Sequence, residues 1–299
     1  MTPIKTIAFV GLGNMGVPMA AQLAAKGFAL ALFDRRPEAA RDFAASHGGC
    51  VAVTLADAAR DVDAAICLLP DDKAVRDVVL RPGGLASSLS SGAVIIDMGT
   101  SAPSATVEIG RDVAKRGIAY VDAPVMGGVV FAKDATLDVM VGGSDSDIER
   151  CMPVLSAVSR RVFRCGALGS GHALKALANY VNAGALVNLI EALAIGSKFG
   201  LDTTIMADAL VHMCSGRQHP LEKKVIPQVL THKFATGMAL GLIAKDMSIA
   251  ADFGHSIGAM MLLADRVCEI WKMAEAKIGA NADHTEVARL WEEGNGIRL

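Results

Sequence analysis

The sequence lacks the features that mark metal-binding, disulfide-rich and nucleic-acid-binding proteins. Its six cysteines include no CxxC pair, which argues against a disulfide framework and favours a reducing compartment. Its seven histidines show no metal-ligand spacing such as HExxH, so we expect no metal ion. The formal net charge of −2 provides no basic surface for phosphates, and we therefore expect no nucleic-acid partner.

Signals for secretion or membrane insertion are also missing. The first apolar run, residues 7–10, is short and ends in glycines, unlike a signal peptide. The longest apolar stretch, residues 173–195, contains Lys175 and Glu191, which are unfavourable in lipid. We interpret this stretch as a buried helix, expect no membrane partner and predict a cytoplasmic location.

Aromatic residues are scarce, at 4% of the chain, while 52% of the residues are hydrophobic. The core must therefore consist mainly of Ala, Val, Leu and Met, which favours closely packed helices. At 299 residues the chain is long enough for two domains with a substantial buried core. The apolar surplus of the C-terminal half also predicts subunit packing, as a homodimer or homotetramer.

Strand-like and helix-like segments alternate through the first half of the chain. The predicted strands cover residues 4–10, 28–33, 62–68, 93–98, 118–122, 137–141 and 161–165. The predicted helices cover residues 14–26, 71–79, 103–116 and 145–158, with Ser144 as the N-cap of the last. Such alternation predicts a parallel sheet that is covered by helices on both faces.

The pattern changes near residue 166. Beyond it we find only helical segments, at residues 170–199, 203–214, 219–230, 238–253, 258–277 and 284–293. The sequence therefore predicts an α/β domain with a parallel-rich sheet over residues 1–165, followed by an all-α domain over residues 166–299 that would serve substrate binding and oligomerisation.

A glycine-rich motif joins the first predicted strand to the first predicted helix; it reads Gly11, Leu12, Gly13, Asn14, Met15, Gly16. Glycine permits the tight turn, lets the backbone approach a pyrophosphate, and allows the helix to pack closely on its strand. The GxGxxG spacing alone is a weak signal. Here it follows a strand, opens a helix and precedes a second strand that ends at Asp34, which predicts a Rossmann-type domain binding NAD or NADP.

The residues after the second strand bear on the choice of dinucleotide. Asp34 is placed to accept hydrogen bonds from the adenosine ribose, which favours NAD over NADP. Arg35 and Arg36 keep NADP open, because either could stack on adenine or meet a 2′-phosphate. The alternative is that both arginines are solvated charges in a loop.

Two common routes to alcohol oxidation are excluded by the spacing of their residues. Short-chain dehydrogenases need Tyr-x-x-x-Lys, but Tyr120 and Tyr180 are followed at that spacing by Pro124 and Gly184. The Cys and His spacings of zinc-dependent alcohol dehydrogenases are absent. A nicotinamide enzyme acting on an alcohol still needs a group that takes the hydroxyl proton.

Lys175 is the best candidate for that group. Lys175, Asn179 and Asn182 fall at i, i+4 and i+7, on one face of a helix that is otherwise almost wholly apolar. These three could be a snorkelling lysine with two solvated amides. A cleft at the domain junction explains them better, because binding sites favour such junctions.

The sequence resembles the β-hydroxyacid dehydrogenases, a family that includes 3-hydroxyisobutyrate dehydrogenase and tartronate semialdehyde reductase. The resemblance covers essentially the whole chain. It rests on four motifs: the glycine-rich signature at residues 7–20, the loop Asp122-Ala-Pro-Val-Met-Gly-Gly128, the lysine-containing segment at 166–179, and the pair Lys245-Asp246.

The resemblance implies an NAD(P)-dependent dehydrogenase that transfers a hydride between nicotinamide and a small 3-hydroxy acid or its semialdehyde. It implies Lys175 as general acid/base, Asn179 as a substrate anchor, and Gly127 and Gly128 as amide donors to the substrate carboxylate. The implied cofactor-binding residues, beside the glycine motif, Asp34 and Arg35, are Leu69, Pro70, Thr100 and Lys245.

The chain departs from the family pattern at Met126, where the family usually has a serine. A thioether is a weak acceptor and donates no hydrogen bond to a carboxylate, so we predict that the substrate is not the family's smallest acid. Arg217 is the nearest compensating donor in the sequence. The alternatives are an imine reductase-like enzyme, whose members generally lack the lysine, and a non-catalytic dinucleotide-binding protein.

Overall fold

The computed structural model describes residues 3–216 and 219–299. The chain divides into two compact units, Met1–Tyr180 and Val181–Leu299. The division lies inside helix α9 (Ser170–Phe199), whose first turns pack on the first unit. The predicted boundary at 165/166 instead marks the end of the last strand, where the sequence pattern changes.

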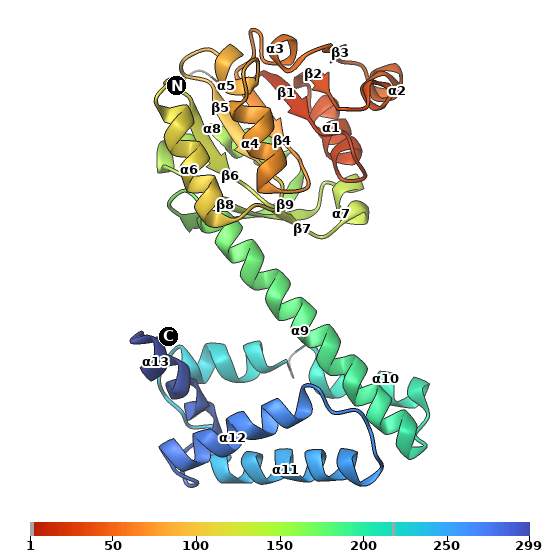
Figure 1. Cartoon of the computed structure of the whole chain (residues 1–299), viewed down its shortest axis with the longest axis vertical. Helices are drawn as coiled ribbons and strands as arrows, with labels where there is room; N and C mark the ends of the chain where they lie inside the picture. The colour runs from red at the N-terminus through yellow and green to blue at the C-terminus, as the bar shows by residue number, and fades with distance from the viewer. Residues whose placement is uncertain (1–2, 217–218) are drawn as a thin grey trace. The chain divides into compact units, whose positions relative to one another are not determined.

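The first unit is built on one mixed sheet (Figure 1). Its strands are β1 (Thr6–Val10), β2 (Ala29–Phe33), β3 (Cys50–Val51), β4 (Ala64–Cys67), β5 (Val94–Asp97), β6 (Ala119–Asp122), β7 (Val125–Met126), β8 (Leu137–Gly142) and β9 (Ser159–Gly166). Their order is β3-β2-β1-β4-β5-β6-β8-β7, with β9 paired to β8. The first six strands of this order are parallel and follow the doubly wound order of dinucleotide-binding domains.

The sheet is not parallel throughout, which corrects the predicted topology at one end. Strand β8 runs antiparallel to β6 and to β7. A parallel return needs a crossover of about a dozen residues or more, usually with a full helix. The segment between β6 and β8 contains β7 and only a five-residue helix, α7 (Val129–Lys133), so the chain returns antiparallel.

Helices cover both faces of the sheet. They are α1 (Gly16–Ala25), α2 (Pro37–His47), α3 (Leu55–Ala58), α4 (Asp72–Leu80), α5 (Leu85–Ser88), α6 (Pro103–Ala114) and α8 (Asp145–Ser156). Alternate strand residues enter two separate cores: Ile7 and Phe9 pack in one, and Ala8 and Val10 in the other. This burial on both faces explains why the strands are continuous apolar runs. Ser144 caps α8 as predicted, accepting a hydrogen bond from the Asp147 amide.

The second unit is helical. Besides the later turns of α9, it contains α10 (Thr203–Cys214), a π-helix η2 (Leu221–Val229), α11 (Leu240–Ser256), α12 (Ala264–Ile278), a 3₁₀ turn η3 (His284–Ala288) and α13 (Arg289–Asn295). No named strand occurs in the part of this unit that the structure describes. An α/β domain followed by an all-α domain is therefore the architecture.

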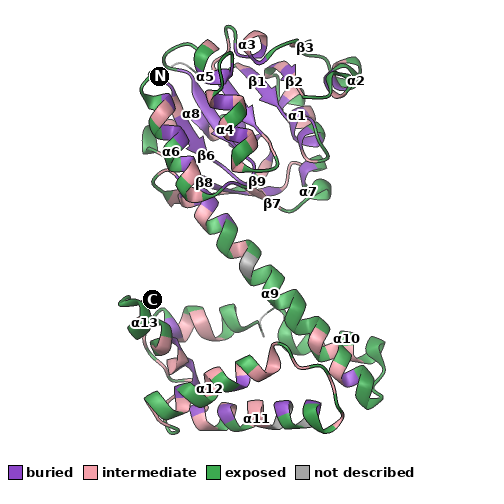
Figure 2. Cartoon of the chain, viewed as in Figure 1, coloured by how far each residue is buried: buried purple, intermediate pink, exposed green. Residues whose placement is uncertain are grey.

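Helix α9 is more exposed than the sequence predicted. Figure 2 colours most of α9 as exposed. Five apolar side chains on it are 43–59% exposed: Val181, Leu186, Val187, Leu189 and Ile190. Among the described residues, α9 alone is long and apolar enough to cross a membrane by length and composition. The prediction of a buried helix is wrong for the single chain, because apolar residues surround the helix and packing on one side leaves the others uncovered.

Candidate active site

A groove runs along the carboxyl ends of β1, β4 and β5 in the first unit. It consists of a cavity of about 450 Å³ beside β2 and a cavity of about 700 Å³ beside β5 and α9. The two cavities share Gly13, Leu68, Leu69 and Pro70, so they are adjoining parts of one groove. Ligands of doubly wound sheets bind at this edge, outside the carboxyl ends of the strands.

The glycines of the motif have two different roles. A Cβ on Gly11 would lie 2.3 Å from the Leu68 carbonyl oxygen, and one on Gly16 would lie 2.0 Å from the Gly11 carbonyl oxygen. Those two positions therefore permit close packing of turn, strand and helix. A Cβ on Gly13 would meet no other residue within 4 Å, and Gly13 lines both cavities, which leaves its backbone open to a phosphate.

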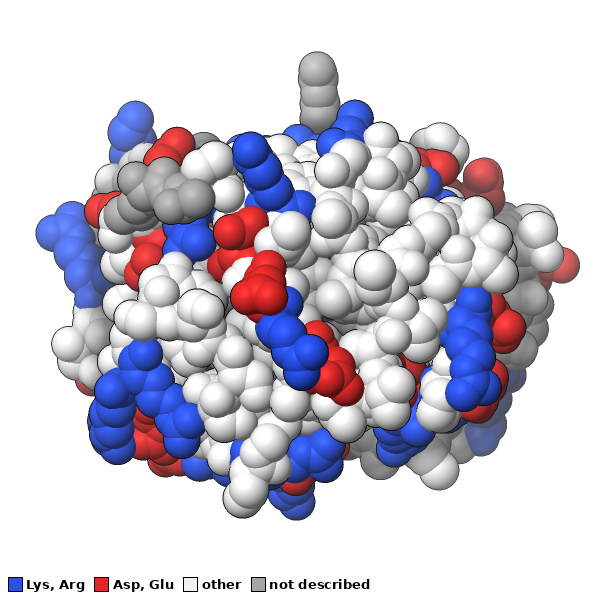
Figure 3. Space-filling model, turned by 90° about the horizontal axis from the view of Figure 1, so that it is seen from above, with Lys and Arg blue, Asp and Glu red and all other residues white. Residues whose placement is uncertain are grey.

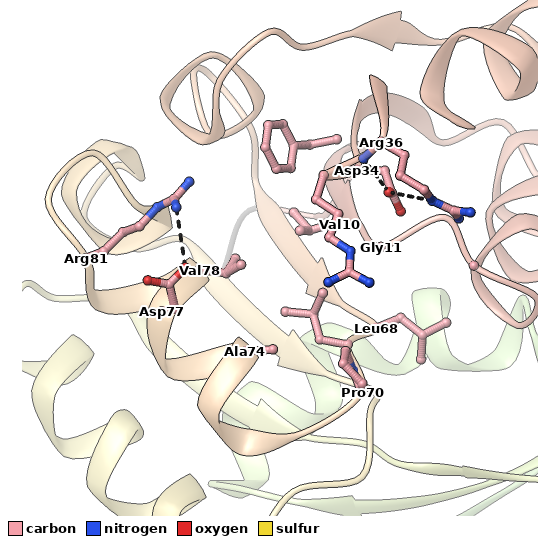
Figure 4. Close-up of a pocket in the computed structure, with 14 residues that line it drawn as sticks. Val10, Gly11, Asp34, Arg36, Leu68, Pro70, Ala74, Asp77, Val78 and Arg81 are labelled. Carbon is pink, nitrogen blue, oxygen red and sulfur yellow. Dashed lines mark hydrogen bonds and ion pairs between the residues drawn. The ribbon is translucent and has the colours of Figure 1, made fainter. Parts of the chain in front are cut away.

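Asp34 connects the end of β2 to the glycine turn. Its Oδ2 accepts a 2.7 Å hydrogen bond from the Leu12 amide, and its Oδ1 accepts a 2.9 Å bond from the Arg36 amide. The Arg36 guanidinium lies 3.6 Å from the same carboxylate (Figure 4). Asp34 also lines the smaller cavity, where the adenosine ribose is predicted to bind.

Basic side chains share the smaller cavity with Asp34. Arg35, Arg36 and Arg81 line it, and Arg81 pairs with Asp77 at 3.4 Å on the opposite side (Figure 4). Arg81 was not predicted from the sequence, because only the fold brings α4 to the carboxyl end of β2. This end of the groove therefore offers a carboxylate for a ribose and guanidinium groups for adenine or a phosphate.

The larger cavity brings together most of the residues predicted for the nicotinamide and substrate side: Asn14, Met15, Gly16, Leu69, Pro70, Thr100, Met126, Gly127, Gly128 and Lys175. Met98, Gly99 and Val125 also line it and were missed. Gly127 and Gly128 have φ angles of +134° and +80°, which a side chain would strain. The loop after β7 thus needs glycine to pass close to the cavity.

Lys175 lies near the start of α9 and is 9% exposed. Its Nζ donates a 2.7 Å hydrogen bond to the Val125 carbonyl oxygen and lies 3.6 Å from the Met126 sulfur. Burial lowers the pKa of the Lys175 amine, and no carboxylate pairs with it among the described residues. A buried amine with a lowered pKa in a cleft is suited to proton transfer.

Other predicted residues are not among those that line the two cavities, or they fall outside the described residues. Asn179 is exposed on α9 and lines neither cavity. Lys245 lies on α11 of the second unit, where it pairs with Asp246 at 3.2 Å. Arg217 lies outside the described residues. The roles predicted for Asn179 and Lys245 remain predictions.

Comparison with known proteins agrees with this geometry. Residues 6–166 match the family described as the NAD binding domain of 6-phosphogluconate dehydrogenase, and residues 169–291 match the NAD-binding domain of NADP-dependent 3-hydroxyisobutyrate dehydrogenase. The chain is 32% identical to 2-(hydroxymethyl)glutarate dehydrogenase of Eubacterium barkeri, over 98% of this chain and 97% of that protein. It is also 32% identical to the mitochondrial 3-hydroxyisobutyrate dehydrogenase of Rattus norvegicus, over 96% and 87%.

The chain belongs to the β-hydroxyacid dehydrogenase family. A crystal structure of an oxidoreductase from Mycobacterium avium superposes with a TM-score of 0.77 at 29% identity, covering 94% of this chain and all of that one. An imine reductase from Myxococcus stipitatus shares the fold, with a TM-score of 0.83 at 20% identity over 97% and 100%. Family membership identifies the cofactor as NAD or NADP.

The groove fits such a cofactor. The open backbone at Gly13 and the start of α1, which no described side chain caps, suit a pyrophosphate. Asp34 and Arg35 line the smaller cavity, where the adenosine is predicted to bind, and Leu69, Pro70 and Thr100 line the cavity that contains Lys175. Each part of a dinucleotide therefore meets residues of suitable chemistry within the first unit.

Proposed function

We propose that this protein is an NAD(P)-dependent 3-hydroxy acid dehydrogenase in which Lys175 is the general acid/base. The observation that carries the proposal is the position of Lys175: its amine is buried, lacks a described carboxylate partner, and lines the same cavity as Thr100 and Gly128. A buried lysine beside the predicted nicotinamide site is what a proton-transfer step at a hydroxyl requires.

The reaction divides between the cofactor and this chain's residues. The dinucleotide, when bound, accepts or supplies the hydride. In the oxidation of the alcohol, the Lys175 amine takes the hydroxyl proton; in the reduction of the semialdehyde, its ammonium returns that proton. The Val125 carbonyl oxygen holds one N–H of Lys175 and so orients the nitrogen. The backbone amides of Gly127 and Gly128 are proposed to receive the substrate carboxylate, and Asn179 to anchor the substrate.

The substrate is proposed to be larger than the smallest 3-hydroxy acids. Met126 brings a flexible apolar side chain to the cavity, beside Lys175, and no hydroxyl donor. The named substrate of the relative from Eubacterium barkeri, 2-(hydroxymethyl)glutarate, is bulkier than 3-hydroxyisobutyrate and carries a second carboxylate. For the cofactor we propose NAD as the preferred form, because the Asp34 carboxylate lines the smaller cavity at the end of β2, where an acidic side chain can bind an adenosine ribose.

A substrate screen with NAD⁺ and NADP⁺ tests the proposal. It should include 3-hydroxyisobutyrate, glycerate, serine and 2-(hydroxymethyl)glutarate, and a cyclic imine with NADPH to examine the imine reductase alternative. Lys175→Ala should lower kcat by about 10²–10⁴-fold with unchanged cofactor affinity. Lys272→Ala, which removes an exposed lysine on α12, is the matched control. Lys175→Ala activity within a few-fold of wild type, or turnover of the imine alone, would refute the proposal.

The partner of the exposed α9 surface is proposed to be a second copy of the chain, in a homodimer or homotetramer. Leu186, Val187 and Ile190 lie toward one side of α9, and their apolar side chains are uncovered in the single chain, as is that of Val181. Leu186→Glu with Ile190→Glu should shift the mass measured by light scattering to that of a monomer. Unchanged mass would exclude this surface as the contact.

Two further expectations concern the cellular setting. The six cysteines carry no disulfide, which supports the proposed cytoplasmic location. On the face shown in Figure 3, basic and acidic side chains are interspersed among uncharged ones. This mixed surface supports a small-molecule substrate over a nucleic acid.

A further inference from the structure

A buried polar cluster lies behind the groove and has no role in the mechanism described above. Its central members are Asp97, Asp122 and His172, of which none is more than 1% exposed. Asp97 ends β5, Asp122 ends β6, and His172 lies in the first turn of α9. The same three elements deliver the Thr100 turn, the loop of Met126 to Gly128, and Lys175 to the larger cavity.

Asp97 organises the turn that carries Thr100. Its Oδ1 accepts a 3.1 Å hydrogen bond from the Gly99 amide, and its Oδ2 accepts a 3.1 Å bond from the Ser101 hydroxyl. The Tyr120 hydroxyl donates to the same Oδ2 at 3.2 Å. Residues on both sides of Thr100 are therefore tied to one buried carboxylate.

Asp122 fixes the start of α9. Its Oδ1 accepts a 2.8 Å bond from the Gly169 amide, and its Oδ2 accepts a 2.7 Å bond from the His172 amide. A Cβ on Gly171 would lie 2.4 Å from the Met140 carbonyl oxygen and 2.8 Å from Asp122 Oδ2. The first turn of the helix is thus held against β6 and β8 by both charge and close packing.

The hydrogen bonds of Thr106 determine the orientation of the His172 ring. The Thr106 hydroxyl donates to the Ala102 carbonyl oxygen at 3.1 Å, so its proton is engaged. It must therefore accept from His172 Nδ1–H, which lies 2.8 Å away. His172 Nε2 then faces Asp97 Oδ2 at 3.9 Å and has no hydrogen-bond partner among the described residues.

The contact between His172 Nε2 and Asp97 Oδ2 is favourable only when one of these two atoms carries a proton. An unprotonated Nε2 would direct its lone pair at a carboxylate oxygen in a site without solvent, which is unfavourable. A proton on either atom converts the contact into an attraction. Burial raises the pKa of Asp97, which acts in the same direction by favouring retention of a proton at this pair.

We propose that His172 is a positioning residue for the hydride-transfer reaction: it joins Asp97 to Asp122 and thereby sets the Thr100 turn and Lys175 relative to each other. Lys175 follows His172 by three residues on the same helix, so a rotation of this turn displaces the amine directly. The inference rests on the proposed role of Lys175. It adds that the contact between His172 and Asp97 fixes the start of α9, and with it Lys175, relative to the end of β5.

Substitutions that retain or remove one ring nitrogen test the proposal. His172→Asn keeps a donor toward Thr106 and loses Nε2, whereas His172→Gln returns an amide toward Asp97. We expect His172→Asn to lower kcat by about 10–100-fold, the cost of a misplaced reacting group, with both KM values within about three-fold. His172→Gln should recover most of the loss. His47→Asn, at an exposed histidine on α2, is the control.

The outcomes separate this inference from the proposed function. A His172→Asn enzyme with wild-type kcat overturns the positioning role, as does a loss confined to KM. Lys175→Ala with wild-type activity overturns the proposed function instead. Should the variants fail to fold, ¹⁵N NMR of histidine-labelled wild type decides: we expect an exchange-protected proton on His172 Nδ1, held by the Thr106 hydroxyl, and an Nδ1 with no such proton overturns the inference.

Discussion

Asp34 is the residue whose replacement tests the cofactor end of the groove most directly. Its carboxylate accepts hydrogen bonds from the Leu12 and Arg36 amides and lines the smaller cavity at the same time. Asp34→Ser should therefore loosen the glycine turn, weaken NAD binding and relax the discrimination against NADP. The freed Arg36 guanidinium, now paired with Asp34 at 3.6 Å, becomes available to a 2′-phosphate.

The magnitudes follow from charged hydrogen bonds. Each bond to a carboxylate contributes about 1.5–3 kcal/mol, so loss of one bond to the ribose weakens NADH binding by about 10–100-fold. Serine still accepts from one of the two amides, and the free energy of unfolding without cofactor should fall by about 1–3 kcal/mol. NADPH affinity should stay constant or rise, because a phosphate no longer meets a carboxylate.

The assay is a fluorescence titration of NADH and NADPH, combined with chemical denaturation of the cofactor-free protein. Asp42→Ser, at an exposed carboxylate on α2, is the matched control and should change neither quantity. Two results would refute the reasoning: a wild-type protein that already binds NADPH more tightly than NADH, or an Asp34→Ser variant with an unchanged ratio of the two affinities.

Four further predictions concern the turn, the site and the second unit. Gly16→Ala should destabilise the fold by about 1–3 kcal/mol, since its Cβ would lie 2.0 Å from the Gly11 carbonyl oxygen. Gly13→Ala should instead weaken cofactor binding with little change in Tm, and equal Tm values for the two variants would contradict these separate roles. Burial lowers the Lys175 pKa below its usual value of ~10.4. As pH rises through this lowered pKa, the rate of alcohol oxidation should increase and the rate of semialdehyde reduction should decrease, and Lys175→Ala should remove both pH dependences. Met126→Ser should raise kcat/KM for glycerate and 3-hydroxyisobutyrate by about 10–100-fold, and no change would show that the backbone amides suffice. Burial tends to raise the pKa of Asp283, but hydrogen bonds from Thr285 and Thr236 outweigh it and hold the pKa well below its usual value. The ionised Asp283 therefore stabilises the fold above pH ~4, and this contribution is lost as pH falls further. Asp283→Asn should lower the free energy of unfolding by about 2–4 kcal/mol at pH 7 and make that free energy less dependent on pH below ~4.

Much of the first unit was predictable because its signals are local. A parallel strand covered on both faces must be largely apolar, and β4 is such a run, as are β1 after Thr6 and β5 before Asp97. The two-residue strands β3 and β7 were missed, since two residues carry no periodicity. The reversal of β8 was missed for a different reason: it depends on the connection from β6 containing strand β7 and only a five-residue helix.

The candidate site divides in the same way. Lys175 was predictable because a charged residue within an apolar helical segment stands out in the sequence itself. The glycine motif was predictable because its spacing reflects a single turn of the backbone. Asp77 and Arg81 were not, since both join the groove from the C-terminal half of α4, outside every recognised motif. Their contribution depends on which strands lie side by side.

The sequence by itself determined the class of fold, the dinucleotide motif and the lysine at the start of α9, because each depends on residues close together in the chain. Only the tertiary structure decided that Asp97 and Asp122 meet at His172, across separations that no local pattern records. It also decided that the apolar side chains of α9 lie exposed in the single chain. Hydrophobicity determines that burying an apolar side chain lowers the free energy, but only the packed fold determines whether another surface covers that side chain.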